Sequence, residues 1–120
     1  MNNLQANELI KNLYNAVDGK DLGYLDKILS ENVNFRIGNY DTISDKAAVL
    51  EANDNFFKSI TKMSHTIENV WNVEKSVLCN GLVDYIRLDG SEYSAYFSTV
   101  LSIENEQIVD YFIYVDISKL

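Results

Sequence analysis

The chain has 120 residues, of which 47% are hydrophobic and 23% charged, and its formal net charge is −8. This is ordinary globular composition, long enough to bury one core, so we expect a single domain over residues 1–120. The 10 basic residues are scattered among 18 acidic ones. An acidic surface repels phosphate backbones, which argues against nucleic acid as a partner.

The number of cysteines and the hydropathy further limit the class of protein to which this chain can belong. The single cysteine, Cys79, cannot form a disulfide within the chain, and one cysteine with one histidine cannot supply a structural zinc site. No apolar run approaches the roughly 20 residues that span a bilayer, and no leader-like segment opens the chain. We therefore expect a cytoplasmic protein with no membrane partner, no metal site and no cofactor.

The first part of the chain predicts two helices. Apolar residues recur mostly at helical spacing over residues 4–17, and again over residues 22–29. Gly19 is expected to end the first helix in the left-handed conformation, and Asp21 is expected to open the second.

A strand and a third helix follow. Residues 33–37 alternate between apolar and polar side chains, which predicts a strand. After a turn, Ser44 is a candidate N-cap for a helix over residues 45–60 that carries Phe57.

From Met63 onward the pattern has period two. It predicts strands over residues 64–73, 76–88, 92–103 and 107–116, with the hairpin signal Asp89-Gly90 between the second and third. Helices followed by such a meander predict an α+β fold. We expect three N-terminal helices packed on a strongly curved, mostly antiparallel sheet that encloses a conical pocket.

The only histidine, His65, opens the first of these late strands. Alternation puts His65 on one face with Ile67, Asn69 and Trp71. An imidazole on an apolar face is either a hydrogen-bonded core residue or a proton carrier in a pocket, since histidine ordinarily titrates near neutral pH.

Several short segments occur in an order that resembles the SnoaL-like branch of the nuclear transport factor 2-like superfamily. They are Val17-Asp18-Gly19-Lys20-Asp21-Leu22, Glu31-Asn32-Val33-Asn34-Phe35, Ser64-His65, Trp71, Asp89-Gly90 and Ile113-Tyr114-Val115-Asp116. The resemblance covers nearly the whole chain and implies a SnoaL-like α+β barrel. It does not fix an activity, because the superfamily holds isomerases, hydrolases, dehydratases, cyclases and non-catalytic binding modules.

Three chemistries of the superfamily are disfavoured by the residues present. Ketosteroid isomerases use a tyrosine and two aspartates where this chain has Leu13, Phe35 and Thr99. Limonene epoxide hydrolases use arginine and two aspartates, of which only Asp84 is retained here. The final-strand carboxylate of SnoaL-type cyclases falls near Ile113.

The catalytic residues of a fourth group of enzymes in the superfamily match this sequence better. Scytalone dehydratase and hexachlorocyclohexane dehydrochlorinase share this fold and use an aspartate that ends the first helix with a histidine that opens the strand after the third. Asp18 and His65 match these positions. The resemblance implies a catalytic pair, with a carboxylate–imidazole contact of about 3 Å. The alternative is that Asp18 only caps the helix end or the following turn.

Further residues are candidates for the wall of the pocket. We assign Asp84 to the inner face because it shares the parity of Leu82 and Ile86, although a strand turned the other way would leave it in water. The complete set of pocket candidates is Tyr14, Phe35, Phe57, Trp71, Asp84, Phe97, Thr99 and Ile113.

The last strand is apolar on both faces, which predicts a homodimer formed through the outer face of the sheet. Two functions remain open. One is a cofactor-independent lyase or isomerase that acts on an apolar, carbonyl-bearing small molecule through His65 and Asp18. The other is a non-catalytic ligand-binding or dimerisation module, in which His65 is structural.

Overall fold

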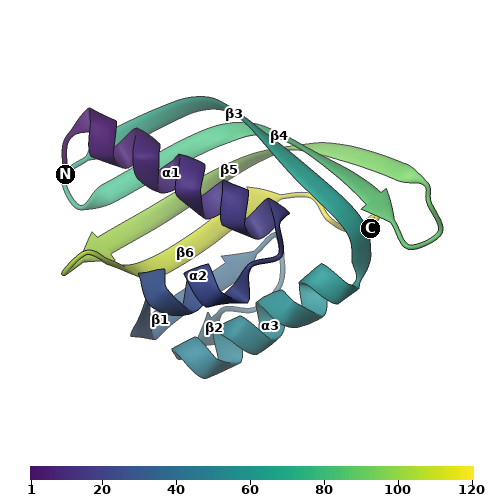
Figure 1. Cartoon of the computed structure of the whole chain (residues 1–120), viewed down its shortest axis with the longest axis horizontal. Helices are drawn as coiled ribbons and strands as arrows, with labels where there is room; N and C mark the ends of the chain where they lie inside the picture. Colours follow the sequence, from purple (N-terminus) through teal and green to yellow (C-terminus); the bar gives the residue numbers. More distant parts are fainter.

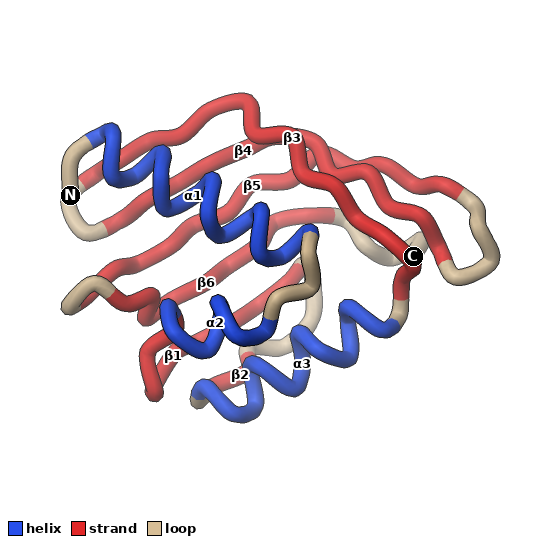
Figure 2. Tube along the Cα trace, in the orientation of Figure 1, coloured by secondary structure: helices blue, strands red, loops and turns tan.

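In the computed structural model, which describes residues 1–120, three helices lie against one face of a six-stranded sheet (Figure 1; Figure 2). The helices are α1 (Asn3–Asp18), α2 (Leu22–Ile28) and α3 (Lys46–Lys58). The strands are β1 (Leu29–Ile37), β2 (Ile43–Ser44), β3 (Ile60–Val73), β4 (Ser76–Arg87), β5 (Glu92–Glu104) and β6 (Gln107–Val115). The α+β prediction is confirmed. None of the helices is long and apolar enough to cross a membrane.

The strand order is β2-β1-β6-β5-β4-β3. Only β1 and β6 run parallel, and the other four neighbouring pairs are antiparallel, as predicted for most of the sheet. The edges β2 and β3 do not pair with each other. The architecture is therefore an open curved sheet, and the closed barrel implied by the resemblance is not formed.

A bulge in β3 changes which side chains face the helices. The register with β4 shifts between Ile67 and Asn69, beside Gly81. A Cβ atom on Gly81 would lie 2.0 Å from the carbonyl oxygen of Thr66, so only glycine lets the two backbones approach so closely. The extra residue reverses the alternation, and Trp71 points away from the helices with 47% of its surface exposed. The prediction that Trp71 shares the face of His65 is wrong for this reason.

Two helix boundaries also differ from the sequence-based prediction. Gly19 has a φ of −84°, and Lys20 takes the left-handed conformation after α1 instead. Ser44 belongs to β2, and the N-cap of α3 is Asp45, whose carboxylate accepts a 2.9 Å hydrogen bond from the backbone N–H of Ala48. The predicted cap Asp21 is confirmed for α2.

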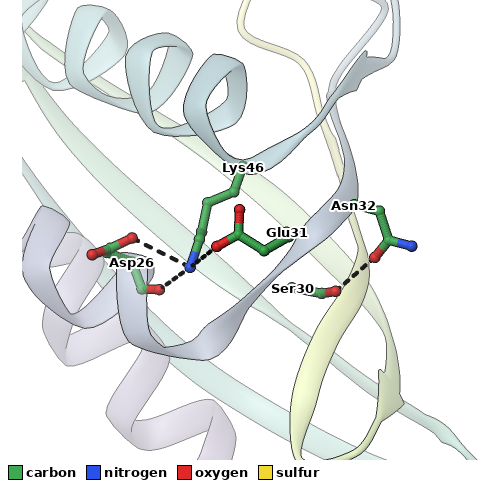
Figure 3. Close-up of polar contacts among 5 residues, drawn as sticks. All are labelled: Asp26, Ser30, Glu31, Asn32 and Lys46. Atoms are coloured by element: carbon green, nitrogen blue, oxygen red, sulfur yellow. Dashed lines mark hydrogen bonds and ion pairs between the residues drawn. The ribbon is translucent and has the colours of Figure 1, made fainter.

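Lys46 joins α3 to helix α2 and strand β1 (Figure 3). Its Nζ donates to the backbone carbonyl of Asp26 at 2.7 Å and forms ion pairs with the carboxylates of Asp26, at 3.3 Å, and Glu31, at 3.2 Å. These partners lie in α2 and β1, and the lysine side chain is only 14% exposed. The contacts fix the N-terminal end of α3, and the second half of this helix supplies one wall of the cavity described next.

Candidate functional site

A cavity of about 640 Å³ lies between the helices and the inner face of the sheet. Eighteen of its 23 lining residues are hydrophobic. It reaches solvent beside Tyr40 and Asp41, which line it and are exposed. The polar residues in its wall are Asp41, Asn53, Asn55, Ser59 and His65. A volume of this size and an apolar wall with few polar groups are typical of small-molecule sites.

Asp18 holds His65 through both carboxylate oxygens. Oδ1 lies 2.5 Å from the ring Nδ1, and Oδ2 accepts a 2.9 Å hydrogen bond from the backbone N–H of the same histidine. The His65 side chain is 7% exposed and the Asp18 side chain 25%. The carboxylate thus orients the ring and its backbone together.

The local structure brings these residues into contact. Asp18 is the last residue of α1, and His65 lies five residues into β3. Lys20 donates from Nζ to the backbone carbonyls of Ile60, at 2.9 Å, and Thr61, at 3.1 Å, which ties the end of α1 to the start of β3.

Two aromatic rings hold the imidazole from the other sides. The centroid of Tyr14 lies 4.4 Å from that of His65, and Phe97 packs edge-on at 5.0 Å. The ring of His65 therefore has little freedom to rotate away from Asp18.

This arrangement fixes the tautomer of a neutral His65. A carboxylate can only accept, so the proton of the neutral ring resides on Nδ1 and the lone pair on Nε2. Nε2 makes no hydrogen bond within the chain, and His65 lines the cavity. The ring can take up a proton at Nε2 from a molecule in the cavity.

Five of the pocket candidates lie in the cavity wall, and three lie elsewhere. Those in the wall are Tyr14, Phe35, Phe57, Phe97 and Ile113. The three that do not line it are Trp71, Asp84 and Thr99. Trp71 is turned outward by the bulge in β3.

Asp84 is exposed on the outer face, where its carboxylate accepts a 2.5 Å hydrogen bond from Ser94 Oγ. The assignment to the inner face is wrong because both faces of β4 carry apolar side chains. The residues that pack beneath the helices are Val83, Tyr85 and others of the opposite parity.

Thr99 does lie on the inner face, yet it is completely buried behind Tyr14. Its hydroxyl is hydrogen-bonded with the Tyr14 hydroxyl. Thr99 therefore supports a wall residue and does not contact the cavity.

Sequence analysis missed Tyr85 as a wall residue. Tyr85 pairs with Met63 in the β3–β4 ladder, one step along the inner face from the pair of His65 and Val83. Tyr85 lines the cavity, and its hydroxyl makes no hydrogen bond within the chain. A phenol is protonated at neutral pH, and burial raises the pKa of Tyr85 further. Correct assignment of the faces of β4 would have identified it.

The cavity wall offers no metal ligand set: no three or more His, Cys, Asp or Glu side chains gather anywhere in the structure.

Comparison with known proteins identifies the family. A family model described as a SnoaL-like domain matches residues 10–111. The chain belongs to the SnoaL-like family. Among curated proteins, no relative matches this SnoaL-like chain.

Solved structures share the fold at low sequence identity. An NTF2-like protein of unknown function from Burkholderia pseudomallei has a TM-score of 0.85 at 16% identity, covering 97% of this chain and 92% of that one. A putative SnoaL-like polyketide cyclase from Jannaschia has a TM-score of 0.83 at 12% identity, with coverages of 94% and 86%. A Mycobacterium tuberculosis LEH-like epoxide hydrolase has a TM-score of 0.81 at 13% identity, with coverages of 95% and 84%. At such identities the similarity concerns the fold alone.

Proposed function

We propose that this protein is a cofactor-independent lyase or isomerase that acts on an apolar, carbonyl-bearing small molecule. The observation that carries the proposal is the 2.5 Å contact between His65 Nδ1 and Asp18 Oδ1 at the wall of an apolar cavity. A histidine oriented by a carboxylate, with its second nitrogen unpaired, is suited to general acid–base catalysis.

In this mechanism His65 Nε2 removes a proton from the carbon next to the carbonyl group. The electron pair of the broken C–H bond forms a C=C bond, and the carbonyl oxygen takes the negative charge. Asp18 stabilises the imidazolium that results. In elimination, the C=O bond re-forms, the electron pair of the enolate C=C bond forms a double bond to the adjacent carbon, and the bond from that carbon to its leaving group breaks as the leaving group takes the proton of the imidazolium. In isomerisation, the C=O bond re-forms and the imidazolium protonates a different carbon of a conjugated enolate.

Tyr85 is the proposed donor to the carbonyl oxygen. A phenol is protonated at neutral pH, burial raises the pKa of Tyr85 further, and no group of the chain accepts its hydrogen bond. Such a donor stabilises the oxygen as its charge develops. His65 and Tyr85 approach the cavity from neighbouring positions of β3 and β4.

Deuterium exchange tests the proposal. The probe is 2-tetralone, a bicyclic ketone with acidic protons beside its carbonyl, incubated in D₂O and followed by NMR. We expect the wild-type protein to accelerate the loss of these protons over buffer. His65→Gln and Asp18→Asn should lower the protein-dependent rate at least ~10²-fold, the usual scale of acid–base catalysis. Asp54→Asn, which removes a partly exposed carboxylate paired with Lys58, is the matched control and should leave the rate unchanged.

The alternative, a non-catalytic ligand-binding module, predicts a different outcome. In that case 2-tetralone binds, but its exchange rate equals that of buffer and does not respond to His65→Gln. Asp18 then serves only to dock the end of α1 on β3.

We further propose that two copies pair through the outer sheet face, in the cytoplasm. Four large apolar side chains on this face are directly paired across four neighbouring strands and form an apolar row. Such a row is suited to an interface between two sheets. Its members are Trp71, Leu78, Val100 and Phe112. None is fully buried in one chain.

A further inference from the structure

The buried face of α3 contains one residue that does not fit a structural role. The helix buries three side chains at a spacing of four, Val49, Asn53 and Phe57. Apolar residues are expected throughout such a stripe. Asn53 is nevertheless only 5% exposed, and with Thr99 it is one of two buried polar residues in the protein.

Asn53 differs from Thr99 in its hydrogen bonds. Thr99 is satisfied by Tyr14, whereas Asn53 donates from Nδ2 to the backbone carbonyl of Val49 at 2.9 Å and receives nothing in return. A carbonyl can only accept, so this contact fixes the orientation of the amide. The carbonyl oxygen Oδ1 is left as an acceptor without a partner in the chain.

This acceptor belongs to the cavity. Asn53 lines it from the helical layer, while His65 and Tyr85 line it from the sheet. The one fully enclosed side-chain oxygen without a partner in the protein is Asn72 Oδ1, so Asn53 Oδ1 is not sealed in the core and is open to the cavity. A molecule with a hydrogen-bond donor on its helix-facing side would supply the missing partner.

We propose that Asn53 is a specificity residue whose Oδ1 accepts a hydrogen bond from a hydroxyl group of the ligand. The ligand is thus a hydroxylated, otherwise apolar carbonyl compound, with its hydroxyl remote from the reacting carbonyl. The assignment of the carbonyl to the sheet side rests on the proposed function. A site that pairs with a hydroxyl discriminates against analogues that lack it, because the protein acceptor then stays unpaired.

Three related ketones test this inference by calorimetry. They are 2-tetralone, 6-hydroxy-2-tetralone and 6-methoxy-2-tetralone, of which only the hydroxyl compound can donate. We expect wild-type protein to bind it about five- to tenfold more tightly than the other two, the usual net effect of one hydrogen bond. Asn53→Leu and Asn53→Ser should abolish this preference.

The matched control is Asn7→Leu. Asn7 makes the same kind of contact, from Nδ2 to the carbonyl of Asn3 at 2.8 Å, but on the exposed side of α1. The Asn7→Leu protein should keep the wild-type preference for the hydroxylated ketone. Equal affinities of wild-type protein for all three ketones overturn the inference, and this comparison needs no variant to fold. A preference that survives in a folded Asn53→Leu protein also overturns it.

The exchange assay separates this inference from the proposed function. Loss of exchange in His65→Gln without a hydroxyl preference contradicts only the role of Asn53. A preference that depends on Asn53, without catalysed exchange, contradicts only the enzyme. Failure of all three ketones to bind overturns both.

Discussion

Tyr14 lies against His65 with ring centroids 4.4 Å apart, and the hydroxyl of Tyr14 is hydrogen-bonded with that of Thr99. Neither Tyr14 nor Thr99 is appreciably exposed. The hydrogen bond between Tyr14 and Thr99 therefore fixes the position of the Tyr14 ring, which in turn packs against the imidazole of His65.

Replacing Thr99 by valine tests this coupling. Thr99→Val keeps the shape but leaves the buried Tyr14 hydroxyl without that partner, and we expect the free energy of unfolding in urea to fall by about 1–3 kcal/mol. Adding Tyr14→Phe should recover part of the loss, since both polar groups are then removed. Thr66→Val, on the exposed side of β3, is the control and should change stability by less than about 0.5 kcal/mol. A Thr99→Val protein as stable as wild type would contradict the coupling.

Stability should decline at alkaline pH. Burial raises the pKa of Cys79 to about 11 and also raises the pKa values of Tyr14, Tyr85 and Tyr111. The folded state holds these protons more tightly than the unfolded state, so their contribution is complete at neutral pH. It is lost as pH rises from about 9, the ordinary value for the thiol, by up to about 1.4 kcal/mol per pH unit for each group.

Urea unfolding at pH 8, 9, 10 and 10.5 measures this decline. Cys79→Ala removes the group that titrates first in the unfolded state. The stability of the Cys79→Ala protein should therefore fall less steeply between pH 9 and 10 than that of the wild-type protein. A stability that is constant from pH 8 to 10.5 is incompatible with protonated, buried phenols and thiol.

The close approach at Gly81 should be intolerant of any side chain. Because a Cβ would lie 2.0 Å from the Thr66 carbonyl oxygen, Gly81→Ala must displace β3 from β4, and we expect a loss of at least about 2 kcal/mol in thermal or urea unfolding. Gly23→Ala, in α2, meets only the side chain of Asp21 at 3.3 Å. It should be neutral or slightly stabilising, as helix Gly→Ala changes usually are. Equal effects of the two substitutions would show that the bulge has no such constraint.

The proposed dimer is tested by light scattering at micromolar concentration. We expect twice the 13.7 kDa of one chain. Val100→Asp places a charge in the middle of the apolar row on the outer face and should yield monomers. Leu4→Asp removes a side chain that is 71% exposed on α1 and should leave the mass unchanged. A wild-type mass of one chain refutes the interface.

The sequence was sufficient for the fold and for the contact between Asp18 and His65. The change from helical to period-two spacing predicts the α+β class and the end of the first helix near Asp18, whereas β3 begins at Ile60, four residues before the predicted start of that strand. The order of these elements, with the family resemblance, is what relates two residues 47 positions apart.

The faces of the strands were not predictable from one sequence. Both parities of β4 are apolar, so periodicity could not place Asp84 outside and Tyr85 inside. The bulge that turns Trp71 outward depends on how Gly81 meets the neighbouring strand, which no local pattern encodes. Asn53 was missed because asparagine in a helix ordinarily indicates an exposed position.

In the proposed mechanism, Asp18 keeps the proton of a neutral His65 on Nδ1, so that Nε2 is the base that meets the ligand. Because His65 is the only histidine, the ¹⁵N spectrum of the histidine-labelled protein reports this ring alone. We predict a protonated Nδ1 and an unprotonated Nε2 in the neutral form, with the Nε2 resonance shifting when 2-tetralone is added. A proton on Nε2, or a spectrum that 2-tetralone leaves unchanged while calorimetry shows it bound, would contradict the account.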